Sequence, residues 1–307
     1  MARARGCLDP VSVTDDFVRV RPRLVRIAYA VLGSHADAED VVSDCWPKLV
    51  AADATSPVLD VEAWAVVAVS RAALDVLRSA RVRRETYVGP WLPEPLVGPA
   101  DSPPDRVTLD ESVRFALMVV LETLSPAERT TWVLHDVFDV PFDEIARIVG
   151  RTPNAVRQLA SRARRHVTEG APRFAVSPEL HAGAVRDFTR AAGTGVLADL
   201  LTTLDPDVVL VSDGGGVVSA ARRPVIGADH VARFLLGIAA KAGDGLRVRP
   251  CRVNGRTGLA LVAGDGLIGV VSFEVSSTGL VSRIDMIRSP AKLALVDPSV
   301  WQDRPDS

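Results

Sequence analysis

Arginine side chains collect on one short stretch near the middle of this sequence, between residues 151 and 165. A guanidinium group donates two parallel hydrogen bonds, which match the oxygens of a phosphate or the edge of a guanine. No acidic residue interrupts the stretch, so its charge has a single sign. The chemistry that these residues favour is binding to nucleic acid rather than a covalent reaction.

A helix, a tight turn and a second helix would hold these arginines in place. The first helix has an apolar stripe at helical spacing, made of Ile145, Ala146, Ile148 and Val149. Gly150 suits the turn, Thr152 is a natural N-cap, and Pro153 fits the first position of the next helix.

The second helix has one apolar and one polar face. Its apolar residues are Val156, Leu159, Ala160 and Ala163. The outward residues that could contact DNA are Thr152, Asn154, Arg157, Gln158, Ser161, Arg162 and Arg165. This layout predicts a helix-turn-helix whose second helix enters the major groove of DNA. A helical hairpin with a solvated basic face is the alternative.

The overall charge does not by itself indicate DNA binding, because 36 basic and 38 acidic residues leave a net charge of −2. The basic residues must therefore be clustered in order to bind DNA. A second cluster holds Arg71, Arg78, Arg81, Arg83 and Arg84. The cysteines, Cys7, Cys45 and Cys251, match no zinc spacing, so we expect neither a metal nor a cofactor. Neither a signal peptide nor a long apolar run is found, which predicts a cytoplasmic protein without a membrane segment.

Periodicity and composition divide the chain into five segments. Residues 12–84 and 106–170 have helical spacing, and the proline-rich residues 85–105 between them predict a linker. Residues 177–296 predict two helices, a strand, a helix and four more strands, and residues 297–307 predict a tail. The expected fold is two all-α modules followed by an α+β cone, in which a curved antiparallel sheet wraps on helices.

These segments resemble the extracytoplasmic-function sigma factors of the sigma-70 family. The first module is similar to sigma region 2, and the second, from Leu121 to Arg165, is similar to sigma region 4. The linker sequence Trp91-Leu92-Pro93-Glu94-Pro95 resembles the WLPEP linker of a subgroup that has a SnoaL-like C-terminal extension. Asp213-Gly214-Gly215-Gly216 resembles the DGGGK motif of that extension, and residues 289–293 resemble its NPDKL-type end.

The resemblance implies a promoter-recognition subunit that has no catalytic residues of its own. It would bind core RNA polymerase, through the β′ and β subunits, and promoter DNA. The polymerase-binding residues would be Asp37, Glu39, Asp40 and Val41, although the acids among them could merely stabilise the start of a helix. The −10 element would be contacted by Arg71, Asp75, Arg78, Arg81 and Arg84, and a loop at 54–59 would hold an extruded base. The −35 element would be read by the outward residues given above.

The C-terminal extension is implied to regulate the factor, so that a separate anti-sigma protein is not required. Its contacts with the stiff apolar linker would set how open the molecule is. Two departures from the family pattern bear on this interpretation. Pro47 falls within a helix of region 2, which we expect it to kink or end. Val217 replaces the lysine of the glycine motif, which removes whatever contact that lysine would make.

Functions of other classes stay open. SnoaL-like domains include isomerases and cyclases, for which Asp213, Asp205 and His181 would be the candidate catalytic residues, but no telling pair of histidine and carboxylate occurs. A DNA-binding regulator whose C-terminal pocket senses a small apolar molecule is another alternative. A one-component repressor would need only one DNA-binding module, which the two-module layout disfavours.

Overall fold

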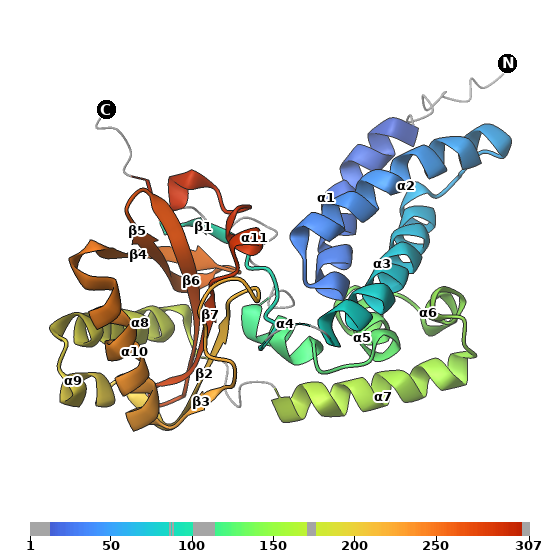
Figure 1. The fold of residues 1–307 in the computed structure, drawn as a ribbon. Coiled ribbons are helices and arrows are strands. Elements are labelled where there is room, and N and C mark those ends of the chain that lie inside the picture. The colour runs from blue at the N-terminus through green and yellow to red at the C-terminus, as the bar shows by residue number, and fades with distance from the viewer. Residues whose placement is uncertain (1–12, 86, 88, 101–113, 171–175, 303–307) are drawn as a thin grey trace, which may run out of the picture. The chain divides into compact units, whose positions relative to one another are not determined.

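A computed structural model of the chain describes residues 13–85, 87, 89–100, 114–170 and 176–302. The chain forms two compact units (Figure 1). The N-terminal unit comprises Met1–Arg78 and Pro126–Ala163, and the C-terminal unit comprises Ser79–Ser125 and Arg164–Ser307. In the described residues, no helix combines the length and the apolar character needed to cross a bilayer.

The N-terminal unit is helical, as the spacing of its apolar residues predicted. Its elements are α1 (Val13–Leu32), α2 (His35–Thr55), α3 (Val61–Glu85), α5 (Pro126–Trp132), a π-helical turn η2 (Val133–Val137), α6 (Phe142–Val149) and α7 (Pro153–Gly170). The last parts of α3 and α7 extend into the C-terminal unit. Gly33, at φ 72°, ends α1 where expected, and the Ser34 hydroxyl accepts a hydrogen bond from the Asp37 amide to begin α2.

Pro47 does not end α2. The helix runs through it from His35 to Thr55, so of the two expected outcomes, a kink or an end, the end does not occur. A proline removes one backbone hydrogen bond and crowds the preceding turn. Here Ala38, Val42, Cys45 and Leu49 remain buried on the apolar side of the helix, while Pro47 itself is exposed. This burial holds α2 together across the missing bond.

Side-chain-to-backbone hydrogen bonds join the two helical modules within the N-terminal unit. The fully buried Arg129 of α5 donates from Nε to the Ala30 carbonyl of α1 at 3.1 Å. Arg23 of α1 donates to the Phe138 carbonyl at 3.0 Å and also pairs with Glu62 of α3. Arginine thus fastens the second module to the first, which the sequence did not predict.

The C-terminal unit is built on a seven-stranded sheet with the order β1-β4-β5-β6-β7-β2-β3. The strands are β1 (Val97–Pro99), β2 (Leu204–Asp213), β3 (Val225–Ile226), β4 (Leu246–Val253), β5 (Arg256–Ala263), β6 (Gly266–Val275) and β7 (Val281–Ile287). The pair β2 and β7 is parallel, and the other described pairs are antiparallel. The runs predicted as strands between residues 208 and 287 all occur as strands.

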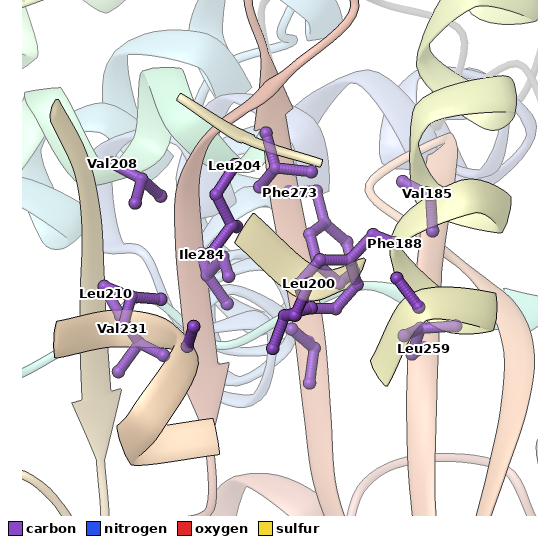
Figure 2. Packing of buried hydrophobic residues seen from close by; sticks show 14 of the residues in the cluster. Val185, Phe188, Leu200, Leu204, Val208, Leu210, Val231, Leu259, Phe273 and Ile284 are labelled. Carbon is purple, nitrogen blue, oxygen red and sulfur yellow. The ribbon is translucent and has the colours of Figure 1, made fainter. Parts of the chain in front are cut away.

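Helices α8 (Pro178–Thr194), α9 (Leu197–Leu201) and α10 (Ala228–Ala242) cover one face of this sheet. Figure 2 shows Phe188 of α8 and Leu200 of α9 near Phe273 and Ile284 of β6 and β7, and Val231 of α10 beside Leu210 of β2. Since successive strand residues point to opposite faces, the neighbours of these strand residues belong to a second core. The observed architecture is the α+β fold expected for a SnoaL-like domain.

The second core lies on the other face of the sheet and includes residues that the sequence placed outside the domain. Leu92 of the linker and Phe115, which begins α4 (Phe115–Leu121), are buried in it. Val300, in the 3-10 turn Pro298–Val300, is buried there too, so the boundary expected at residue 296 is too early. Residues 101–113 and 303–307, parts of the expected linker, second module and tail, lie outside the described residues.

The linker also contributes a strand, which proline content argued against. β1 pairs antiparallel with β4, with Gly98 opposite Arg252. The Asn254 amide donates to the Leu96 carbonyl at 2.8 Å, and the Leu96 amide donates to the Asn254 side chain at 3.0 Å. Proline is tolerated on an edge strand, where its missing N–H interrupts no internal ladder. Part of the linker is therefore an integral strand of the C-terminal unit.

Glu274 of β6 is a largely buried acid, and we expect it to make the stability of the C-terminal unit depend on pH. Burial raises its pKa to about 7, with a smaller contribution from Asp285, against the opposing effects of Arg256, Arg114 and Arg283. An acid whose pKa is raised by folding stabilises the fold below its unfolded pKa, and this stability is lost as the pH rises through the folded value.

We expect Glu274→Gln to flatten the fall in thermal stability between pH 5 and pH 8, by up to about 3 kcal/mol. Differential scanning calorimetry across this range measures the effect. Glu179→Gln, at an exposed carboxylate of α8, is the control and should keep the slope of the unchanged chain. An unaltered slope in Glu274→Gln would show that other groups cause the pH dependence.

Candidate functional site

The helix-turn-helix forms as the sequence predicted. Ile145, Ala146, Ile148 and Val149 of α6 are buried, and Gly150 adopts the left-handed conformation at φ 71° that ends this helix. The Thr152 hydroxyl accepts a hydrogen bond from the Ala155 amide at 3.3 Å, which caps α7. These features fix the direction in which α7 leaves the turn.

The polar face of α7 is exposed, whereas Val156, Ala160 and Ala163 are buried and Leu159 is half-buried. All seven residues predicted to face DNA are exposed: Thr152, Asn154, Arg157, Gln158, Ser161, Arg162 and Arg165. A row of donors on one side of a capped helix is the geometry with which a recognition helix reads base edges.

Two of these arginines have intramolecular partners that differ in kind. Arg157 donates to the Asn154 side chain at 2.9 Å, and its guanidinium lies 5.5 Å from the centre of the Phe142 ring. Both contacts keep the guanidinium on the exposed face. Arg162 instead pairs at 2.9 Å with Glu128, which is largely buried on α5. Arg162 thus also ties α7 to α5, a role that the sequence did not predict.

The exposed face of α3 carries the residues expected at the −10 element. Arg71, Asp75 and Arg78 are all exposed, and Asp75 pairs with Arg78 at 3.2 Å. Arg71 donates from Nη2 to the Arg147 carbonyl of α6 at 3.0 Å, which holds its guanidinium beside α6. The side chains of Arg81 and Arg84 lie outside the described part of the structure.

The loop between α2 and α3 is shorter than the expected 54–59, because α2 continues to Thr55. Leu59 in this loop is 97% exposed, which is a costly position for an apolar side chain in water. Trp64 and Val67 of α3 are half-buried and line a cavity of about 440 Å³ with Glu144 and Arg147.

The acidic start of α2 presents fewer side chains than the sequence suggested. Asp40 is exposed, Asp37 is half-buried, and Glu39 pairs with Arg21 of α1. Val41 is 7% exposed and packs inward, so its side chain is not available to a partner. Of the four residues expected to bind polymerase, only the three acids keep side chains at the surface, and Val41 supports the helix beneath them.

A second candidate site lies in the C-terminal unit, where three segments that are far apart in sequence meet at Asp213. This carboxylate is fully buried at the end of β2. It accepts hydrogen bonds from the Tyr87 hydroxyl at 2.6 Å, from the Leu92 amide at 2.9 Å and, within its own loop, from the Gly215 amide at 2.9 Å. Two of the three donors belong to the linker.

Lys292 supplies the positive charge that this buried carboxylate requires. Its ammonium group lies 2.6 Å from Asp213, donates to the Leu92 carbonyl and sits 4.1 Å from the centre of the Trp91 ring. Burial would raise the pKa of Asp213, but Lys292 and the hydrogen bonds outweigh burial and hold the pKa below its usual value. We call Asp213, Lys292, Tyr87, Trp91 and Leu92 the linker clamp.

The glycine motif is required by the geometry of this clamp. A Cβ atom on Gly214 would lie 2.4 Å from the Val218 carbonyl oxygen, and one on Gly215 would lie 2.7 Å from the Ser289 hydroxyl. Gly215 and Gly216 also have φ near 70°, which disfavours other residues. Val217 is 79% exposed, so its side chain takes no part in the clamp, and the cation comes from residue 292 instead.

The regulatory linker residues predicted from the sequence are largely buried in the C-terminal unit. Leu92, Pro93, Glu94 and Pro95 are buried, and Trp91 is half-buried beneath Lys292. Tyr87 and Lys292 were missing from the predicted site. Both lay within sequence already singled out, but no local signal pairs Lys292 with Asp213, which is 79 positions away in the sequence.

The three candidate catalytic residues do not form a common site. Asp213 is held in the clamp, and Asp205 accepts a hydrogen bond from the Asp207 amide. His181 is buried, its Nε2 lies 3.0 Å from the Phe273 carbonyl, and burial lowers its pKa. None of the three lines the large apolar cavity of the same domain.

Comparison with known proteins defines the class of this protein. The family model for sigma-70 region 2 matches residues 17–83, and the model for sigma-70 region 4 matches residues 114–167. These are the two helical modules described above. The match for region 4 begins at the entrance to α4, which belongs to the C-terminal unit.

The chain belongs to the extracytoplasmic-function sigma factors of the sigma-70 family, which direct promoter-specific initiation by RNA polymerase. It is 42% identical over 253 residues to the "ECF RNA polymerase sigma factor SigJ" of Mycobacterium tuberculosis (strain ATCC 25618 / H37Rv), covering 81% of this chain and 78% of SigJ. It is 34% identical over 291 residues to the "Probable ECF RNA polymerase sigma factor SigI" of strain CDC 1551 / Oshkosh, covering 93% of this chain and 95% of SigI.

The fold has a counterpart among solved structures. The crystal structure of SigJ from Mycobacterium tuberculosis matches this chain with a TM-score of 0.73 and 35% sequence identity. The match covers 92% of this chain and 98% of that chain, so it includes the C-terminal α+β domain. The resemblance to extracytoplasmic-function sigma factors inferred from the sequence is confirmed.

Proposed function

We propose that this sigma factor reads the −35 element with the exposed face of α7, contacts the −10 element with α3, and docks on the β′ subunit of core polymerase through Asp37, Glu39 and Asp40. Its C-terminal domain regulates these activities by holding the linker, in place of a separate anti-sigma protein. Like the polymerase it serves, the factor acts in the cytoplasm. The C-terminal domain performs no catalysis and offers a site for a small apolar ligand.

One observation above all supports the proposal that the C-terminal domain regulates the factor. The clamp joins the linker between the two DNA-binding modules to a carboxylate of the C-terminal domain through Tyr87, Leu92 and Lys292. A linker held in this way restricts the separations that regions 2 and 4 can adopt. Because the −10 and −35 elements lie at a set spacing on DNA, such a restriction controls promoter binding.

Arg157→Ala is expected to weaken −35 binding by about 1–3 kcal/mol, with loss of preference for the base that it contacts. Arg162→Ala should lose a comparable amount, although part of its effect would come from releasing Glu128. Fluorescence anisotropy on promoters with single substitutions in the −35 element measures both.

Glu128→Gln separates the two effects of Arg162, because it removes the intramolecular ion pair and leaves the arginine for DNA. Its −35 affinity should equal or exceed that of the unchanged chain. Wild-type affinity and base preference in both arginine variants would refute the assignment of α7 to the −35 element.

A further inference from the structure

The C-terminal domain encloses a cavity of about 430 Å³ between its helices and its sheet. Side chains from α8, α10 and four strands line it, among them Phe188, Leu235, Leu246, Leu261, Phe273 and Met286. Protein interiors are close-packed, and the few voids in them are near the size of one water molecule. This cavity instead falls in the range of about 300–1,000 Å³ that is usual for ligand sites.

The lining determines which chemistry the cavity can accept. Among the described residues that line it, none carries an ionisable side chain. Its one hydroxyl belongs to Thr189, which donates to the Val185 carbonyl at 2.7 Å. The oxygen of Thr189 is left to accept a hydrogen bond, but nothing in the lining could neutralise a charge. A buried carboxylate or ammonium would therefore be strongly disfavoured.

The cavity opens to solvent along an apolar rim. Gly193 of α8 and Ala239 of α10 are exposed where they line it, and Val248 of β4 is 41% exposed. The charged neighbours of Val248 on β4, Arg247 and Arg249, point to the opposite face, since strand residues alternate. No cation of this strand therefore stands at the entrance to hold an anionic head group.

We propose that this cavity binds one uncharged, predominantly hydrocarbon molecule, such as a medium-chain alcohol or a terpenoid alcohol, with Thr189 accepting the hydroxyl hydrogen. Strand β7 has residues on both sides of the sheet, toward the cavity and toward the linker clamp. Ile284 and Met286 of β7 face the cavity, whereas Ile287 lies in the opposite core with Leu92. A ligand that expands the core between the helices and the sheet would thus act on a strand that supports the clamp.

The test uses the full purified chain and the neutral fluorophore N-phenyl-1-naphthylamine, without polymerase or DNA. Saturable binding at a single site with enhanced fluorescence is expected. 1-Decanol should displace the probe, and decanoate at neutral pH should do so at least about tenfold less well, because its carboxylate would be buried without a partner. No saturable site, or equal displacement by both compounds, would overturn the proposal.

Glycine substitutions provide a matched pair of variants. A Cβ at Gly193 meets nothing within 4 Å, and the same holds for Gly237 of α10, which does not line the cavity. Gly193→Phe is expected to reduce probe binding at least about tenfold by filling the mouth, and Gly237→Phe should leave it unchanged. Ala239→Phe, on α10, is a second variant that should block the mouth. It covers the case in which the phenylalanine ring at position 193 turns toward solvent.

Unreduced binding in both rim variants, with thermal unfolding showing them to be folded, would place the probe elsewhere and refute the site. The inference rests on the proposed function only in treating this domain as a regulator. Because the assay contains neither polymerase nor promoter, its failure would remove the ligand site and leave the linker clamp to be judged by transcription.

Discussion

Lys292→Met is expected to release the linker and to change promoter-dependent transcription while the two DNA-binding modules stay folded. The substitution keeps most of the apolar stem but leaves the carboxylate of Asp213 buried without its cation. Removing one partner of a buried ion pair costs about 3–5 kcal/mol. It also removes the cation over Trp91 and the donor to the Leu92 carbonyl. The linker would therefore exchange its amide hydrogens faster over residues 87–99.

Hydrogen exchange and run-off transcription with purified core polymerase measure the two consequences. Lys241→Met removes a lysine from the exposed surface of α10 and should change neither. Adding Asp213→Asn to Lys292→Met should restore part of the stability, because the unpaired charge is then gone. Unchanged exchange and unchanged transcription in Lys292→Met would mean that the C-terminal domain does not regulate through the clamp.

The clamp should also fail in acid. The pKa of Asp213 is held below its usual value in the folded chain, so its contribution is present above the unfolded pKa of about 4 and is lost as the pH falls through the folded value. Exchange over residues 87–99 should rise below about pH 4, a range well separated from the loss of stability that Glu274 causes as the pH rises toward neutrality.

Simultaneous replacement of Asp37, Glu39 and Asp40 by alanine is expected to weaken binding to core polymerase by about 100-fold or more. The fold should survive, because the cap of α2 uses the Asp37 amide rather than its carboxylate. Loss of the partly exposed pair between Glu39 and Arg21 costs at most about 1 kcal/mol. Co-purification with core enzyme and biolayer interferometry provide the measurement.

A control with the same change of net charge is Glu179→Ala, Asp187→Ala and Asp199→Ala, at three exposed acids of the C-terminal unit. It should bind core polymerase as the unchanged chain does. Equal affinities for the two triple variants would show that the acidic start of α2 serves only its own helix.

Local signals explain how much of this structure could be predicted. The turn at Gly150, the cap at Thr152 and the spacing of apolar residues in α6 and α7 lie within a few residues of each other, and they were sufficient to predict the helix-turn-helix. The strands after residue 204 were predicted because β-branched runs alternate with glycine-rich turns.

What could not be predicted depends on contacts between distant segments. The pairing of β1 with β4 joins residues about 150 positions apart, and nothing local distinguishes Val97–Pro99 from the rest of a proline-rich linker. Likewise, Lys292 acquires its role only when β7 and β2 bring its segment beside Asp213. Burial of Val41 depends on how α2 packs on α1. The acidic residues around Val41 suggested instead that it lies on an exposed surface.

The position of α4 has a consequence for how such proteins can be recombined. Phe115 lies in the same core as Leu92 and Ile287, so the region that is inherited as part of a DNA-binding module is stabilised by the domain that follows it. A chimera that exchanged only residues after 176 would pair a foreign sheet with this linker and this helix. Residues 87–121 would have to be exchanged together with the C-terminal domain. Helix α7, which lies between these two segments in the sequence, would keep its original residues.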